Sequence, residues 1–139
     1  MSASRPDWLS FSVPGLGLSF RYPGVAADGE RVEMDDFRAH FRTMDSAQVY
    51  FEISQHTGVS PNELYRREAA AIRRANPDAR VSDAESVSFA GCAARRFTVT
   101  FPDKERVFTL IEREGRVYRV IYDPRSAVNE EIINTISFD

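Results

Sequence analysis

The chain has 139 residues, of which 42% are hydrophobic and 28% charged, and its net charge is -3. A chain of this size buries roughly two-thirds of the surface that its unfolded form exposes, so we predict a single domain over residues 1–139. The negative net charge argues against a nucleic acid partner, and the one cysteine, Cys92, excludes an internal disulfide and multi-cysteine metal motifs.

Four segments in the first part of the chain alternate apolar with polar residues, the pattern of strands that bury one face. Residues 9–13 and 16–22 flank Pro14 and Gly15, which predicts a hairpin followed by a loop over residues 23–30. Residues 37–44 and 47–54 predict two further strands. We expect the polar face of both to be largely exposed to water.

A helix start at Ser60 is the strongest local signal. Ser60 is a favoured N-cap residue, and Pro61 suits the first helical position. The Glu63 side chain can accept a hydrogen bond from the Ser60 backbone N–H, which completes a capping box. Asn76 and Pro77 end the helix, because the residue before a proline disfavours the helical conformation. The pattern therefore predicts a helix from Ser60 to about Ala75.

Four strands and a closing helix are predicted for the remainder of the chain. Residues 87–89 and 95–101 have strand patterns on either side of a turn at Gly91 and Cys92. Residues 107–111 and 117–122 carry apolar side chains on both faces, which indicates central strands covered on both sides. A short amphipathic helix follows from about Ser126 to Ile136.

This order of elements predicts an antiparallel sheet of the α+β class. Because the two central strands are apolar on both sides, each face of the sheet needs a cover, and one helix is available for each. We therefore predict an α/β/α sandwich whose helices flank both faces of the sheet.

Glu68 is an unusual residue because it falls between Leu64 and Ile72 on the apolar side of the predicted helix. A half-buried carboxylate needs a partner. One interpretation is an ion pair with a sheet arginine such as Arg96 or Arg119. The alternative is an acid of shifted pKa in a ligand pocket.

No common catalytic or nucleotide-binding motif occurs in the sequence. The stretch from Gly58 to Asn62 begins like a nucleophile elbow but lacks the second glycine, and Ser60 is better explained as a cap. The two histidines, His40 and His56, have either a paired acid–base or metal role or isolated surface positions. We predict no catalytic residue, no cofactor and no metal.

Two weaker candidates for chemistry remain. Cys92 would be a reactive thiol if Arg95 and Arg96 lowered its pKa. Asp35 and Asp36 would contribute to a cation site, although adjacent residues of a strand point to opposite faces.

The polar face of the two early strands is the predicted protein-binding surface. Arginine and tyrosine are enriched at binding hot spots, and both occur here beside a histidine. The alternative is an ordinary solvated sheet face. The predicted contact residues are Arg38, His40, Arg42 and Tyr50.

Four short motifs lie in order along the chain. The predicted hairpin ends in an F-x-Y-P pattern, Phe20-Arg21-Tyr22-Pro23, and a glycine turn with Gly91, Ala94 and Arg95 follows later. The other two are the aromatic strand over residues 118–122 and the closing segment over residues 133–138. Together these motifs resemble the PsbP/Mog-like and DcrB-like domain superfamily, and the resemblance covers nearly the whole chain in its order of elements.

The resemblance implies a helix–antiparallel sheet–helix sandwich without enzymatic activity. Members of the superfamily assist other proteins as a photosystem II extrinsic subunit, as a nuclear-import factor that binds a small GTPase, or as chaperones of secreted effectors. No functional residue of these proteins can be matched here. We expect a non-enzymatic accessory or chaperone-like domain whose partner is another protein or a second copy of this chain. The alternative is a small-ligand-binding domain or an unrecognised enzyme using Glu68 or the histidines.

The sequence contains no stretch approaching the ~18 apolar residues of a membrane helix. Its first residues carry Arg5 and Asp7 and no apolar core, unlike a signal peptide. Many bacterial relatives are exported lipoproteins, but their leader and lipid-acceptor cysteine have no counterpart here. We expect a cytoplasmic protein, or an exported one if a leader has been removed.

Overall fold

The structure is a computed structural model that describes residues 8–12, 17–23, 32–34, 38–42, 50–125 and 127–138. The predicted turn at Pro14 and Gly15 lies outside the described residues, as do most of the predicted loop after Pro23 and the candidate cation residues Asp35 and Asp36.

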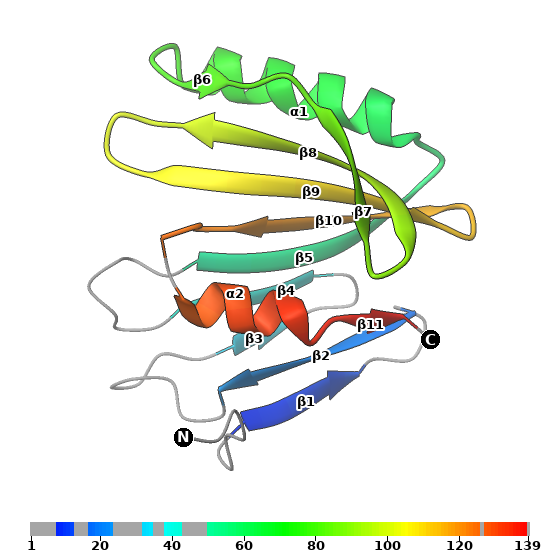
Figure 1. The fold of residues 1–139 in the computed structure, drawn as a ribbon. Helices are drawn as coiled ribbons and strands as arrows, with labels where there is room; N and C mark the ends of the chain where they lie inside the picture. Colours follow the sequence, from blue (N-terminus) through cyan, green and yellow to red (C-terminus); the bar gives the residue numbers. More distant parts are fainter. Residues whose placement is uncertain are drawn as a thin grey trace.

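Two antiparallel sheets and two helices make up the described fold (Figure 1). The larger sheet has eight strands in the order β3–β4–β5–β10–β9–β8–β6, and β7 also pairs with β8. Its strands are β3 (Val32–Met34), β4 (Arg38–Arg42), β5 (Tyr50–Thr57), β6 (Arg80–Val81), β7 (Glu85–Phe89), β8 (Cys92–Thr100), β9 (Glu105–Arg113) and β10 (Arg116–Tyr122). The smaller sheet has three strands in the order β1–β2–β11, with β1 (Trp8–Ser12), β2 (Leu18–Pro23) and β11 (Ser137–Phe138). The helices are α1 (Pro61–Ala75) and α2 (Ala127–Asn134).

The two strands with apolar residues on both faces are central, as predicted. β9 lies between β8 and β10, and β10 lies between β9 and β5. Residues 107–111 of β9 are all buried, whether they belong to one face or the other. Burial on both sides explains the continuous apolar run in these strands.

Helix α1 packs on one face of the large sheet. Leu64 shares an apolar cluster with Phe97 of β8 and Phe108 of β9. The Tyr65 ring meets the Phe97 ring edge-on at a centroid distance of 4.8 Å. The start of α1 is as predicted, because Ser60 Oγ accepts a hydrogen bond from the Glu63 backbone N–H at 3.1 Å. The helix ends at Ala75, before Asn76 and Pro77.

The opposite face is covered by the small sheet together with α2. Leu18 and Phe20 of β2 and Ile132 of α2 share a cluster with Ile53 and Val120 of the large sheet. The α+β class and the antiparallel sheet are confirmed. The finer expectation of a helix layer on both faces is not confirmed, because strands form part of this second cover.

The C-terminal segment differs from the prediction. Helix α2 ends at Asn134, and the following residues form β11, which pairs with β2 through Phe138 and Leu18. The Thr135 hydroxyl donates to the Ile132 carbonyl at 2.6 Å, which occupies a helix-end acceptor where the chain leaves the helix. Ile132 and Ile136 are both buried, although Ile136 lies beyond the end of the helix.

Candidate functional site

The four predicted contact residues share one face of the large sheet. Directly opposed residues of antiparallel strands belong to the same face. The β4–β5 register pairs Arg38 with Ser54, His40 with Glu52 and Arg42 with Tyr50. The β5–β10 register carries this face on to Arg119, which stands opposite Ser54. It is the face on which α1 packs.

Part of this face is buried, which corrects the expectation of a largely wet surface. Glu52 and Ser54 are each 5% exposed. Sequence alternation marks a polar face but does not reveal that another element covers it. The contact role of Arg38, His40, Arg42 and Tyr50 stays a prediction.

The two histidines do not form a pair. His40 stands opposite Glu52, whereas His56 stands opposite Val117. Four strand positions therefore separate the two along β5, which corresponds to about 13 Å. His56 is half-buried, and its Nε2 makes a 3.0 Å hydrogen bond with Ser54 Oγ.

One arginine holds two carboxylates between α1 and the sheet. Arg119 of β10 donates through Nη1 to Glu68 Oε2 at 2.6 Å and through Nη2 to Glu52 Oε2 at 3.1 Å. The Arg119 and Glu68 side chains are 11% and 20% exposed. The partner expected for Glu68 is thus Arg119, one of the two arginines named from the sequence. The group links α1, β5 and β10 and carries one net negative charge.

A second charged group lies where β10 leads into α2, and sequence reasoning missed it. The fully buried Asp123 accepts from Arg125 Nη2 at 2.7 Å and from Arg106 Nη1 at 3.2 Å. Burial by itself would raise the pKa of Asp123, but the hydrogen bonds from Arg125 and the charges of both arginines lower it below the ordinary value. The sequence feature that could have revealed this group is the Asp-Pro-Arg turn, in which Asp123 Oδ1 accepts a hydrogen bond from the Arg125 backbone N–H.

The thiol of Cys92 lies away from the arginines expected beside it. Cys92 and Arg95 are an odd number of residues apart on β8, so they belong to opposite faces. The nearest arginine contact is a 3.8 Å hydrogen bond from Arg113 Nη1 to Cys92 Sγ.

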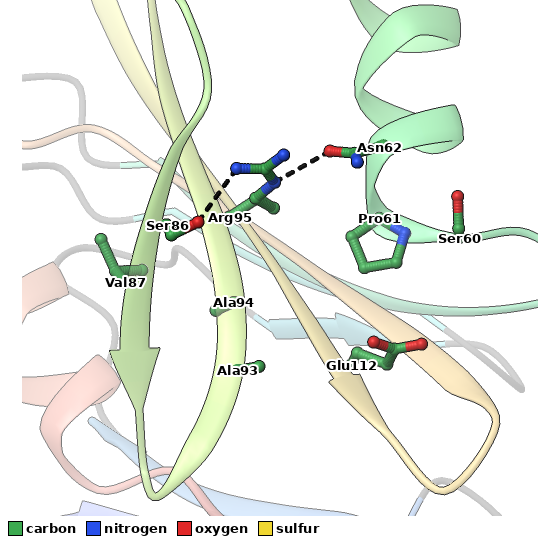
Figure 2. A pocket seen from close by; sticks show the side chains of 9 residues that line it. All are labelled: Ser60, Pro61, Asn62, Ser86, Val87, Ala93, Ala94, Arg95 and Glu112. Carbon is green, nitrogen blue, oxygen red and sulfur yellow. Dashed lines mark hydrogen bonds between the residues drawn. The ribbon is translucent and has the colours of Figure 1, made fainter.

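A cleft of about 360 Å³ lies between the start of α1 and strands β7, β8 and β9 (Figure 2). Arg95 of β8 spans it, donating through Nε to Asn62 Oδ1 at 2.8 Å and through Nη1 to Ser86 Oγ at 3.0 Å. The lining residues are Ser60, Pro61, Asn62, Ser86, Val87, Ala93, Ala94, Arg95 and Glu112. None of these was singled out from the sequence as a ligand-binding residue, because the cleft exists only once α1 folds against the sheet.

Neither a metal-binding cluster nor a membrane-spanning helix occurs among the residues that the structure describes. Within the described ranges, no three His, Cys, Asp or Glu side chains gather in an arrangement that would hold a metal ion. Neither helix described by the structure is both long and apolar enough to cross a membrane.

The arrangement of elements is similar to that of a solved structure over the whole chain. The solution structure of cyanobacterial PsbP from Synechocystis sp. PCC 6803 matches with a TM-score of 0.67 and 11% identity, covering 100% of this chain and 96% of that chain. The fold is PsbP-like. The resemblance noted in the sequence is therefore confirmed for the fold.

A second match is a crystal structure from Bacteroides thetaiotaomicron VPI-5482, with a TM-score of 0.56 and 20% identity over 94% of this chain. This chain spans about half, 48%, of that protein chain. No protein-family model and no curated protein sequence matches this chain. At these identities the PsbP-like likeness concerns the fold alone.

Proposed function

We propose that this chain is a non-enzymatic accessory domain that binds another protein. The observation that carries the proposal is the β4–β5 register, which aligns Arg38, His40, Arg42 and Tyr50 on one face toward an edge of the sheet. Arginine and tyrosine contribute disproportionately to binding hot spots. The PsbP-like fold agrees with an accessory role and adds no particular partner.

Two of the three groups that the sequence offered for acid–base chemistry, Glu68 and His56, are engaged within the fold. Glu68 accepts a hydrogen bond from Arg119, and His56 is bonded to Ser54. The ion pair between Glu68 of α1 and Arg119 of β10 serves the contact between the helix and the sheet. This engagement supports a binding role over an enzymatic one.

A small-ligand-binding role is the second candidate, and the cleft beside α1 favours it. Small-ligand sites are concave and combine apolar walls with a few placed polar groups. The cleft has both. Its lining does not include Glu68 or the histidines, which were the ligand-binding candidates from the sequence.

Affinity capture with the parent protein and two variants tests the protein-binding role. The purified chain, an Arg42→Ala/Tyr50→Ala variant and an Arg73→Ala/Arg74→Ala control are each used to capture partners from native cells. Arg73 and Arg74 are exposed on α1 and lie away from β4 and β5, so the control removes side chains without touching the proposed surface. We expect the same co-purifying protein on the parent and control baits and its loss from the Arg42/Tyr50 variant.

Two results would contradict this proposal. Retention of every partner by the Arg42→Ala/Tyr50→Ala variant would show that the surface is wrong. Turnover of a metabolite by the purified protein would refute the non-enzymatic role. Size-exclusion chromatography tests whether the partner is a second copy of this chain, and cell fractionation tests the expected cytoplasmic location.

A further inference from the structure

The cleft beside α1 is built from three separate parts of the chain. Ser60, Pro61 and Asn62 come from the start of α1, Ser86 and Val87 from β7, and the others from β8 and β9 (Figure 2). Its volume of about 360 Å³ falls within the range of roughly 300–1,000 Å³ found for small-molecule sites. The cleft is therefore large enough for a small ligand.

Neutral side chains around the cleft have hydrogens left to donate. Asn62 Oδ1 and Ser86 Oγ already accept from Arg95, and Ser60 Oγ accepts from the Glu63 backbone N–H. The Asn62 amide NH2 and the two serine hydroxyl hydrogens make no hydrogen bond within the described part of the chain. Together with the guanidinium of Arg95, they form a set of donors that a carboxylate would satisfy.

Arg95 and Glu112 line the same cleft without pairing. They lie on neighbouring strands, since Arg95 of β8 is opposite Leu110 of β9 and Glu112 follows two residues later on β9. No ion pair joins either of them to an oppositely charged side chain among the residues that the structure describes. Arg95 is held in place by neutral oxygens alone, and Glu112 is exposed. The cleft therefore presents one unneutralised charge of each sign.

The remaining lining is apolar. Pro61 and Ala93 contribute it on the side of Arg95, whereas Val87 and Ala94 belong to the apolar cluster on the other face of the sheet. A ligand that uses both charges can place an apolar side chain against this lining. Glu112 disfavours phosphate and other dianions by repulsion, whereas it attracts an ammonium group.

We propose that this cleft binds a free α-amino acid with an apolar side chain. Its carboxylate accepts hydrogen bonds from Arg95, Asn62 and the Ser86 hydroxyl, and its ammonium group pairs with Glu112. The side chain packs against Pro61 and Ala93. This inference does not depend on the protein-binding role proposed for β4 and β5, which involves other residues.

Titration of the intact chain by two-dimensional NMR tests the proposal with three matched probes. L-leucine carries both charged groups, 4-methylpentanoate lacks the ammonium group, and 3-methylbutylamine lacks the carboxylate. We expect leucine to cause saturable shifts of the Asn62, Ser86 and Glu112 amide signals. Each single-charge probe should bind at least about tenfold more weakly than leucine.

Variants with matched neighbours assign the two charges. Arg95→Met should abolish binding of leucine and 4-methylpentanoate, whereas Arg96→Met should bind as the parent does, because Arg96 lies on the other face of β8. Glu112→Gln should remove the preference for leucine over 4-methylpentanoate, and Glu114→Gln in the adjacent turn should keep it. If Arg95→Met does not fold, Arg95→Lys, which keeps the charge and loses the planar fork, should bind leucine about tenfold more weakly.

Three outcomes would overturn the proposal. The first is the absence of a saturable shift with leucine. The second is equal affinity of the parent for leucine and 4-methylpentanoate, which would remove the role of Glu112. The third is unchanged leucine binding by a folded Arg95 variant.

Discussion

Arg119 pairs with two carboxylates that approach it from different elements. Glu68 reaches it from α1 and Glu52 from the neighbouring strand β5. Because Arg119 is 11% exposed, its charge is largely removed from water and depends on these partners. Loss of Glu68 would leave this desolvated guanidinium with one carboxylate partner, Glu52, in place of two, and would remove its link to α1.

Replacement of Glu68 by alanine tests this dependence. We expect Glu68→Ala to lower the free energy of unfolding by about 1–3 kcal/mol and Glu68→Gln to lower it less, because the amide keeps the shape and one acceptor. Urea denaturation measures both. Glu63→Ala is the matched control, since the Glu63–Arg67 pair is exposed and should contribute about 0.5 kcal/mol or less. If both Glu68 variants are as stable as the parent, the ion pair does not support the helix–sheet contact.

Asp123 makes the stability depend on pH. Its pKa is lowered in the folded chain from the ordinary value of 3.8, so the unfolded chain binds more protons as the pH falls. The stability that Asp123 contributes is therefore fully present above about pH 5 and is lost as the pH falls through the folded-state pKa.

Urea denaturation between about pH 7 and pH 3 checks this dependence. We expect Asp123→Asn to be less stable than the parent at neutral pH and the difference to shrink on acidification. Asp78→Asn, at an exposed position, should keep the slope of the parent. A constant difference between Asp123→Asn and the parent would show that this carboxylate does not titrate with folding.

At the scale of single elements, local signals placed α1 and the central strands well. Ser60, Pro61 and Asn76 act within their own turns of the chain, so the bounds of α1 follow from neighbouring residues. Strand β11 did not follow from such signals, because two residues form a strand only when β2 is there to pair with them. The short strands β3 and β6 were missed for the same reason.

The N-cap of α1 gives a prediction at this scale. Ser60→Ala removes the acceptor of the Glu63 backbone N–H and should lower the free energy of unfolding by about 1 kcal/mol. The denaturation midpoint should fall at unchanged slope. Ser88→Ala, on the exposed side of β7, should leave the midpoint unchanged. A Ser60→Ala midpoint equal to that of the parent would mean that water replaces the cap without loss.

At the scale of the whole molecule, the small sheet and α2 share one apolar cluster with the large sheet. Leu18 of β2, Ile132 of α2 and Tyr118 of β10 all belong to it. Phe138 of β11 packs against Tyr118 at a ring-centroid distance of 5.4 Å. A shared core predicts that both sheets unfold together.

Two spectroscopic probes test this cooperation. Trp8, the single tryptophan, lies in β1 of the small sheet, whereas far-UV circular dichroism follows both sheets and the helices. We expect coincident urea transitions, and Phe138→Ala should shift both by on the order of 1–3 kcal/mol. A fluorescence transition at lower urea than the dichroism transition would show that the small sheet unfolds separately.

The sequence by itself determined the α+β class, the hairpin strands, the central position of β9 and β10, and the span of α1. It also indicated that Glu68 needs a sheet arginine. These properties depend on periodicity and on residues close together in the chain. Tertiary structure alone decided that a three-stranded sheet shares the second cover with α2, that Glu52 and Asp123 are buried, and that Arg95 meets Asn62 beside Glu112. Each of these joins segments far apart in the sequence, and no local pattern encodes which of 18 basic residues a given carboxylate or cleft will meet.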